Sequence, residues 1–320
     1  MAWLAGGLPG RFMQKAGSWS AGDERMTKSQ LSELVSMKDP AAVRTEVLYL
    51  ARLVAPGLPD VALARTWDDV CRLYRGEYRG YRACATGYHD RFHMMDVTLA
   101  TMRLLHGAAV DGMRISPMDA ANVFLAALFH DVGYIQSKTE TEGTGARFTS
   151  THVARGIEFM KTYLAAHPVS PSDAETVATL MRFTDLGDPV ERIAGDSTPE
   201  SVLGRIVAAG DLLGQMADRT YLEKLPALYE EFRESGNTQF DSAFSLLKNS
   251  LQFNILMQER LTRDLGSVDF YMQTHFRARW GIDEDLYAEA IARNMSYLSD
   301  VVRHHPDDWA EYLKRSLPDE

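Results

Sequence analysis

Two short runs of the sequence carry side chains that could bind a metal ion or move protons. The first contains His89 and His93, four residues apart, with Asp96 three residues later. The second is the pair His130-Asp131, which ends a strongly apolar run. Imidazole and carboxylate groups in an apolar setting must be paired or coordinated, because an isolated buried charge is costly. A divalent cation is the simplest shared partner, since both groups are ligands for Zn, Fe or Mn.

Two further residues extend this candidate ligand set. Asp211 lies within the apolar run Val207–Leu213, where a carboxylate needs a partner. This carboxylate could form a buried ion pair or accept an N–H group, and the more specific interpretation is that it binds a metal ion. His152 falls in the first turn of an expected helix, so a capping or surface role competes with a role as ligand.

Helices are the elements that must position these residues. Apolar residues recur mainly at helical spacing, and period-2 alternation is scarce, so the sequence predicts an all-α fold with almost no sheet. The expected helices cover residues 40–54, 60–82, 89 to about 106, 117–129, about 151–164, 170–183, about 199–213, 219–234, 239–265, 268–280 and 285–302.

The helix over 117–129 has the clearest start signal. Ser116 can cap it, Pro117 suits the first helical position, and Asp119 can complete a capping box. Ser170-Pro171-Ser172-Asp173 repeats this pattern. The helix over 117–129 is apolar almost all round, which predicts a central position. It delivers His130-Asp131 at its C-terminal end, where the negative end of the helix dipole favours a cation.

Composition narrows the classes of function. The chain has 320 residues, 45% of them hydrophobic and 24% charged, with a net charge of −10. No basic stripe is present, so duplex nucleic acid is not the expected main partner. The two cysteines, Cys71 and Cys84, form no disulfide framework, which favours a reducing cytoplasm. No apolar run reaches the roughly 18 residues of a membrane helix.

The sequence predicts one domain behind a short leader. Residues 1–25 are rich in Gly and Ser and are interpreted as a flexible leader, or as a mis-assigned start with Met26 as the initiator. Residues 26–320 form the single all-α domain, with the metal-site core at about 85–235 and a helical extension at 236–320. The apolar C-terminal helices suit a homodimer, although core packing explains them equally well.

The ordered set of His93, His130-Asp131 and Asp211 resembles the HD-domain metal-dependent phosphohydrolase superfamily. In that family a His, a His-Asp pair and a later Asp lie on helices and bind metal. The resemblance covers about residues 85–235 and implies an HD-domain/PDEase-like helical bundle. In many bacterial HD proteins a further His falls roughly where His152 stands, which implies a contribution to a second metal site or a contact with the substrate phosphate.

A narrower resemblance concerns the run Tyr88-His89-Asp90-Arg91-Phe92-His93 with Asp96-Val97. This run is similar to the Tyr-His-Asn-x-x-His…Asp-Val signature of class I cyclic-nucleotide phosphodiesterases. The resemblance implies that His89 is the general acid and that His93 is a metal ligand. It also implies that His130, Asp131 and Asp211 complete the first metal site, with Asp131 bridging to a second metal.

The sequence departs from the phosphodiesterase pattern at several positions. Asp90 replaces the signature Asn, and Val132-Gly133-Tyr134 replaces x-x-His-Pro-Gly. No Asn-Pro-Thr-Lys element follows Asp211, and no glutamine can be assigned to the purine. These differences weaken the cyclic-nucleotide assignment more than the phosphohydrolase assignment.

The expected function is therefore metal-dependent hydrolysis of a phosphoric ester of a nucleotide-like small molecule, with a cyclic mononucleotide as one candidate. Two divalent ions, drawn from Mn, Mg, Fe or Zn, would activate hydroxide. His89 would act as general acid and Asp131 as the bridging catalytic carboxylate. The alternatives are a non-catalytic, metal-stabilised signalling module and a di-iron HD-fold oxygenase. The oxygenase needs a richer set of His residues, and the run 181–184 contains none.

Overall fold

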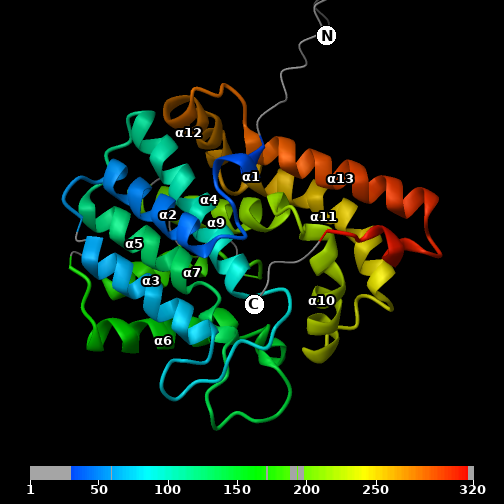
Figure 1. The fold of residues 1–320 in the computed structure, drawn as a ribbon. Coiled ribbons are helices and arrows are strands. Elements are labelled where there is room, and N and C mark those ends of the chain that lie inside the picture. The colour runs from blue at the N-terminus through cyan, green and yellow to red at the C-terminus, as the bar shows by residue number, and fades with distance from the viewer. Residues whose placement is uncertain (1–29, 59, 171, 188–192, 194–197, 316–320) are drawn as a thin grey trace, which may run out of the picture.

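The fold is all-α. The computed structural model describes residues 30–58, 60–170, 172–187, 193 and 198–315 (Figure 1). Within these ranges the only strand-like pairings are two isolated bridges, Arg75–Ala83 and Tyr81–Ser137. The α-helices are α1 Leu31–Leu34, α2 Pro40–Val54, α3 Asp60–Tyr74, α4 Arg91–Val110, α5 Pro117–Phe129, α6 His152–Ala166, α7 Ala174–Arg182, α9 Pro199–Ala217, α10 Tyr221–Glu234, α11 Ala243–Arg263, α12 Tyr271–Trp280 and α13 Leu286–His304. The 3-10 helices are η1 Val132–Tyr134, η2 Gly145–Phe148, η3 Val268–Phe270 and η4 Trp309–Tyr312. The expectations for residues 1–25 and Met26 lie outside the described residues.

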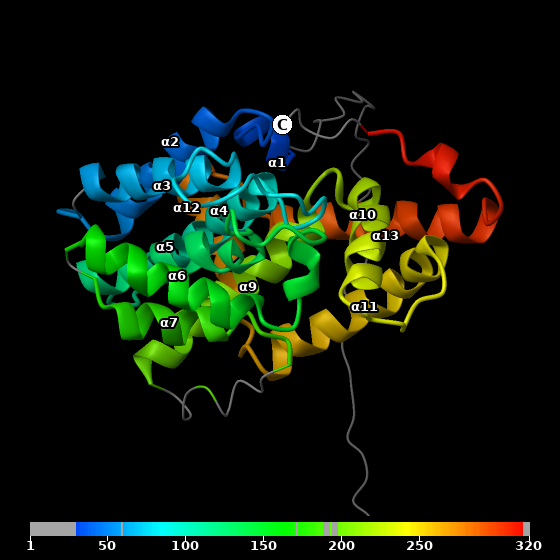
Figure 2. The same cartoon turned by 90° about the horizontal axis from the view of Figure 1, so that it is seen from below.

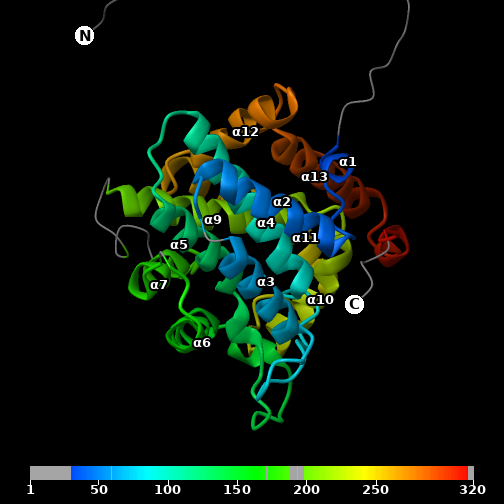
Figure 3. The ribbon, with the colours of Figure 1, turned by 60° about the vertical axis from the view of Figure 1, so that its left-hand side comes forward.

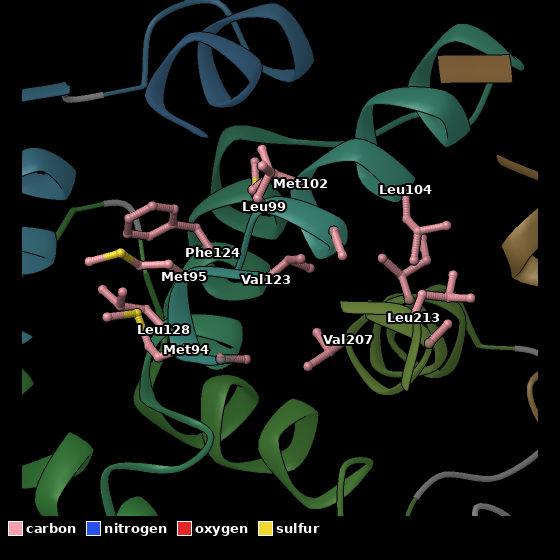
Figure 4. Packing of buried hydrophobic residues seen from close by; sticks show 14 of the residues in the cluster. Met94, Met95, Leu99, Met102, Leu104, Val123, Phe124, Leu128, Val207 and Leu213 are labelled. Carbon is pink, nitrogen blue, oxygen red and sulfur yellow. The ribbon is translucent and has the colours of Figure 1, made fainter. Parts of the chain in front are cut away.

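Helix α4 is the centre of the bundle. It packs against α2, α5, α9 and α12, and every residue from Phe92 to Ala108 is buried (Figure 3). Methionines and leucines of α4 meet Phe124 and Leu128 of α5, while Leu104 faces Leu213 of α9 (Figure 4). Burial on all sides explains why α4 shows so little amphipathic character. A helix held this way provides a rigid support for polar side chains at its ends.

The central helix α5 begins as its sequence predicts. Asp119 N donates to Ser116 Oγ at 3.1 Å, and Ser116 N donates to Asp119 Oδ2 at 2.9 Å, which completes a capping box after which Pro117 opens the helix. All residues from Ala120 to Phe129 are buried. The prediction that the similar signal opens a helix at Ser170 is wrong, because α7 begins at Ala174 and Asp173 is its cap.

Helix α3 is shorter than the predicted helix over 60–82. It ends at Tyr74, because Gly76 adopts a φ of 72° that a side chain would strain. Gly76 N donates to Leu73 O at 3.1 Å and Glu77 N to Arg72 O at 2.9 Å, the pattern of a Schellman motif. The chain from here to α4 is an irregular loop that leads directly to His89.

Helices α10, α11 and α13 gather at one end of the molecule, away from α6 and α7 (Figure 2). This matches the predicted C-terminal helices, including the break near Gly236 between α10 and α11. In the described part of the chain, no helix combines the length and the apolar character needed to cross a membrane.

Candidate metal centre

Three of the predicted ligands meet where α4 and α5 come together. His93 Nε2 lies 3.2 Å from Asp131 Oδ2, and His130 Nε2 lies 3.1 Å from the same oxygen. The two Nε2 atoms are 3.4 Å apart, and all three residues are buried. Ligands about 2.0–2.1 Å from one cation are about 3–3.5 Å from each other. The spacing of these donors therefore fits a single divalent ion.

Asp211 adds a fourth donor from α9. Its Oδ1 is 3.6 Å from His93 Nε2 and 3.9 Å from His130 Nε2. The neighbouring Gly210 makes this approach feasible, because a Cβ there would lie 2.0 Å from Thr101 Oγ1 of α4. The carboxylate predicted to need a partner in an apolar helix thus lies beside the two histidines.

His152 lies near the other oxygen of the shared carboxylate. Its Nε2 is 3.5 Å from Asp131 Oδ1, whereas the distances to His93 and His130 are to Oδ2. Gly133 permits this arrangement, since a Cβ at that position would lie 1.9 Å from the His152 carbonyl oxygen. Asp131 therefore has at least one imidazole near each of its two oxygens.

Backbone carbonyls orient two of the imidazoles. His130 Nδ1 donates to Ala127 O at 2.8 Å, and His152 Nδ1 donates to Thr149 O at 2.6 Å. A proton fixed on Nδ1 leaves Nε2 free to coordinate, which is the usual support of a histidine ligand.

The carboxylates also set the protonation of this cluster. Burial lowers the pKa of His130, but the charge and hydrogen bond of Asp131 outweigh it and raise the value to about 9. Burial alone would raise the pKa of the Asp131 carboxyl, yet His130 and His93 hold it well below its usual value. The same negative charge that holds a proton on His130 would hold a cation, so metal binding would release a proton.

His89 lies before α4 and not on it. The prediction of one helical face for His89, His93 and Asp96 was wrong in this respect, because Asp90 caps the helix by accepting the His93 N–H at 2.8 Å. Asp96 is buried and does not join the cluster; burial, followed by the charge of Asp218, raises its pKa well above the usual value.

Glu231 of α10 holds His89 in place. The His89 Nδ1 atom is 2.5 Å from Glu231 Oε2, and Glu231 Oε1 accepts the Tyr88 N–H at 2.6 Å. The Glu231 side chain is 5% exposed and that of His89 is 17% exposed. Burial lowers the pKa of His89, but the charge and hydrogen bond of Glu231 raise it above its ordinary value. Glu231 therefore favours the protonated form of the His89 imidazole next to the candidate ligand His93.

A stack of three rings joins His89 to His152. The Tyr134 ring lies parallel to His89, with centroids 4.4 Å apart and an angle of 11°. Its other face stacks on His152 at 4.6 Å and 22°. Tyr134 is 2% exposed, so it is a fixed spacer between the candidate acid and the candidate ligand.

Glu231 and Tyr134 were not predicted as functional residues. Glu231 is one of several acidic residues in a polar helix, and only its burial in the fold distinguishes it. The sequence contains only a weak indication of a role for Tyr134, which occupies the position of the histidine in the x-x-His-Pro-Gly part of the phosphodiesterase pattern.

A protein-family model described as Npun_R2479-like matches residues 136–254. The match spans less than half of the chain and runs from the loop before α6 into α11. It includes His152, Asp211 and Glu231, whereas His93 and His130-Asp131 precede it. No curated protein matches the chain.

Proposed function

We propose that the protein is a metal-dependent hydrolase of phosphoric esters that acts on a nucleotide-like small molecule. The observation that carries the proposal is the placement of imidazole donors on both oxygens of Asp131, with a Glu231-held His89 beside them. A purely structural ion site needs the donors but has no use for a partly exposed imidazole whose protonated form is stabilised by a buried carboxylate.

Each residue has a distinct role in this proposal. His93, His130, Asp131 and Asp211 would hold one ion, and His152 together with Asp131 would contribute to the binding of a second. Divalent cations, when bound, would lower the pKa of a coordinated water and neutralise phosphoryl oxygens. His89 donates a proton to the leaving alkoxide, a contribution of about 10²–10⁴-fold.

The test combines metal content and activity on one sample. Elemental analysis would be followed by assays of bis-p-nitrophenyl phosphate and a panel of cyclic and linear nucleotides, with Mn²⁺, Mg²⁺ or EDTA. Bound metal with EDTA-sensitive cleavage that is lost in His130→Ala would support the proposal. Metal-free protein with no turnover under any cation would favour a non-catalytic helical module, and bound iron with oxygen consumption would favour an oxygenase.

Replacing Glu231 by glutamine should move the pH dependence of hydrolysis. A general acid works only while protonated, so the alkaline limb of kcat/KM follows the pKa of His89. Removing the negative charge of Glu231 lowers that pKa, and the alkaline limb should shift to lower pH. A pH–rate profile measures the shift. Glu230→Gln, at an exposed position of the same helix, serves as the control. An alkaline limb that does not shift in Glu231→Gln would contradict the role of His89 as general acid.

Changing Tyr134 should separate ring stacking from hydroxyl chemistry. Tyr134→Leu removes both stacked faces and should lower kcat by about tenfold, whereas Tyr134→Phe keeps them and should remain near the parent. Elemental analysis of both variants checks that metal is retained. Equal losses in the two variants would show that the hydroxyl, and not the stack, matters.

A further inference from the structure

Arg103 is a buried cation in the C-terminal half of α4, ten residues after the candidate ligand His93. It is 2% exposed, and its Nη1 donates to Tyr287 Oη at 3.1 Å. Its Nε and Nη2 atoms are fully enclosed and have no hydrogen-bond partner in the described part of the chain. This guanidinium therefore has two unused donors and no hydrogen-bonded carboxylate among the described residues.

These two donors form the edge that binds carboxylates elsewhere in this protein. Arg44 uses Nε and Nη2 for Asp68 at 2.8 and 2.9 Å. Arg75 uses the same atoms for Glu77 at 3.0 and 2.8 Å, and Arg279 uses them for Glu46 at 3.3 and 3.2 Å. The parallel N–H groups of this edge suit one anion bound by both. On Arg103 no carboxylate of the described chain meets this edge.

His275 of α12 is a second buried polar group near Arg103, whose charge acts on its imidazole. It is fully buried, its Nδ1 lies 3.2 Å from His106 Nδ1, and its Nε2 has no partner among the described residues. Burial, followed by the charge of Arg103, lowers the pKa of His275 to about 2, so the imidazole is neutral. The nearby Glu46 is already paired with Arg279. Asp96 lies seven residues before Arg103 on α4, and burial raises its pKa well above the usual value although the charge of Arg103 lowers it, so this carboxyl is a poor counterion.

We propose that Arg103 and His275 bind a small monovalent anion of about the size of chloride between α4 and α12. A water molecule could accept the N–H bonds but could not neutralise the guanidinium, and an unpaired buried charge is strongly destabilising. In the bound form Arg103 Nε and Nη2 donate to the anion, and His275 donates from Nε2 while its Nδ1 accepts from His106. The aromatic rings of Phe276 and Tyr287, 5.5 and 5.7 Å from the guanidinium carbon, complete the surroundings.

The test compares thermal unfolding of the full chain in sodium chloride and in sodium gluconate at equal ionic strength. Chloride should raise the Tm by about 2–4 °C, because a ligand that binds only the native state stabilises it. Arg103→Met keeps the length of the side chain without its charge, and it should remove the chloride response. This variant should fold, since an apolar replacement for a buried charge is commonly tolerated.

Two controls make the result specific. Arg103→Lys keeps the charge but loses the two parallel donors, so its chloride response should weaken, while the exposed Arg293→Met should respond like the parent. A crystal soaked in bromide should show an anomalous peak beside Arg103 Nε and Nη2. Equal Tm values of the parent protein in both salts, or an unchanged response in Arg103→Met, would overturn the proposal in favour of an enclosed water.

Discussion

Replacing Asp131 by alanine should reduce phosphodiester turnover by at least about 10³-fold and remove most of the bound metal. Asp131 is the one candidate ligand whose two oxygens face different imidazoles, with Oδ2 near His93 and His130 and Oδ1 near His152. Its loss would therefore affect both ions of the proposed site at once. Elemental analysis and a diester assay on the same preparation measure the two effects.

Matched variants distinguish this result from misfolding. Asp131→Asn keeps the shape of the side chain but weakens coordination, and it should show the same direction of change with a native circular dichroism spectrum. Asp68→Ala removes an exposed aspartate that pairs with Arg44 and should retain metal and activity. Full turnover by Asp131→Ala would exclude the proposed reaction at this site.

Replacing His89 by glutamine should lower hydrolysis of alkyl phosphodiesters by about 10²–10⁴-fold without loss of metal. The reason is that His89 contacts Glu231 and Tyr134 and makes no close contact with Asp131. A p-nitrophenolate leaving group departs without a proton, so bis-p-nitrophenyl phosphate should be hydrolysed at nearly the parent rate. Comparing kcat for the two substrate types measures the role of the proton.

The ratio between the substrates is the decisive quantity. Equal losses for alkyl and p-nitrophenyl esters would assign His89 a structural role or a place among the ligands. His304→Gln removes an exposed imidazole that pairs with Asp300, and it should leave both rates unchanged.

The fold was largely predictable because its signals are local. The cap formed by Ser116 and Asp119 lies within four residues, and the apolar run after it requires burial wherever the chain places it. The predicted end of α3 was wrong because the backbone conformation of one glycine overrides the helical spacing of the side chains. Gly76 ends α3 although the aromatic spacing continues through Tyr78, and Tyr78 then packs on Phe159 from a loop.

The site was predictable only in part because some of its contacts span long distances in sequence. His93, His130-Asp131 and Asp211 have donor types that are rare in apolar helices, so each is noticeable by itself. Glu231 acts on His89 across 142 residues, and no local pattern marks it. Its role follows from the packing of α10, which the sequence does not specify.

Two glutamates of helix α10, one turn apart, each contact a different loop. Glu231 accepts the Tyr88 N–H and contacts the His89 imidazole, and Glu234 accepts the Thr144 hydroxyl at 2.7 Å. The candidate metal ligands lie on α4, α5, α6 and α9 or at their ends, and none is on α10. Pro226 interrupts the hydrogen bonds within α10. If the proposed reaction holds, partial unfolding of this one helix would release His89, the proposed proton donor, without displacing a candidate ligand. Amide hydrogen exchange in α10 would then report on catalytic competence independently of metal occupancy.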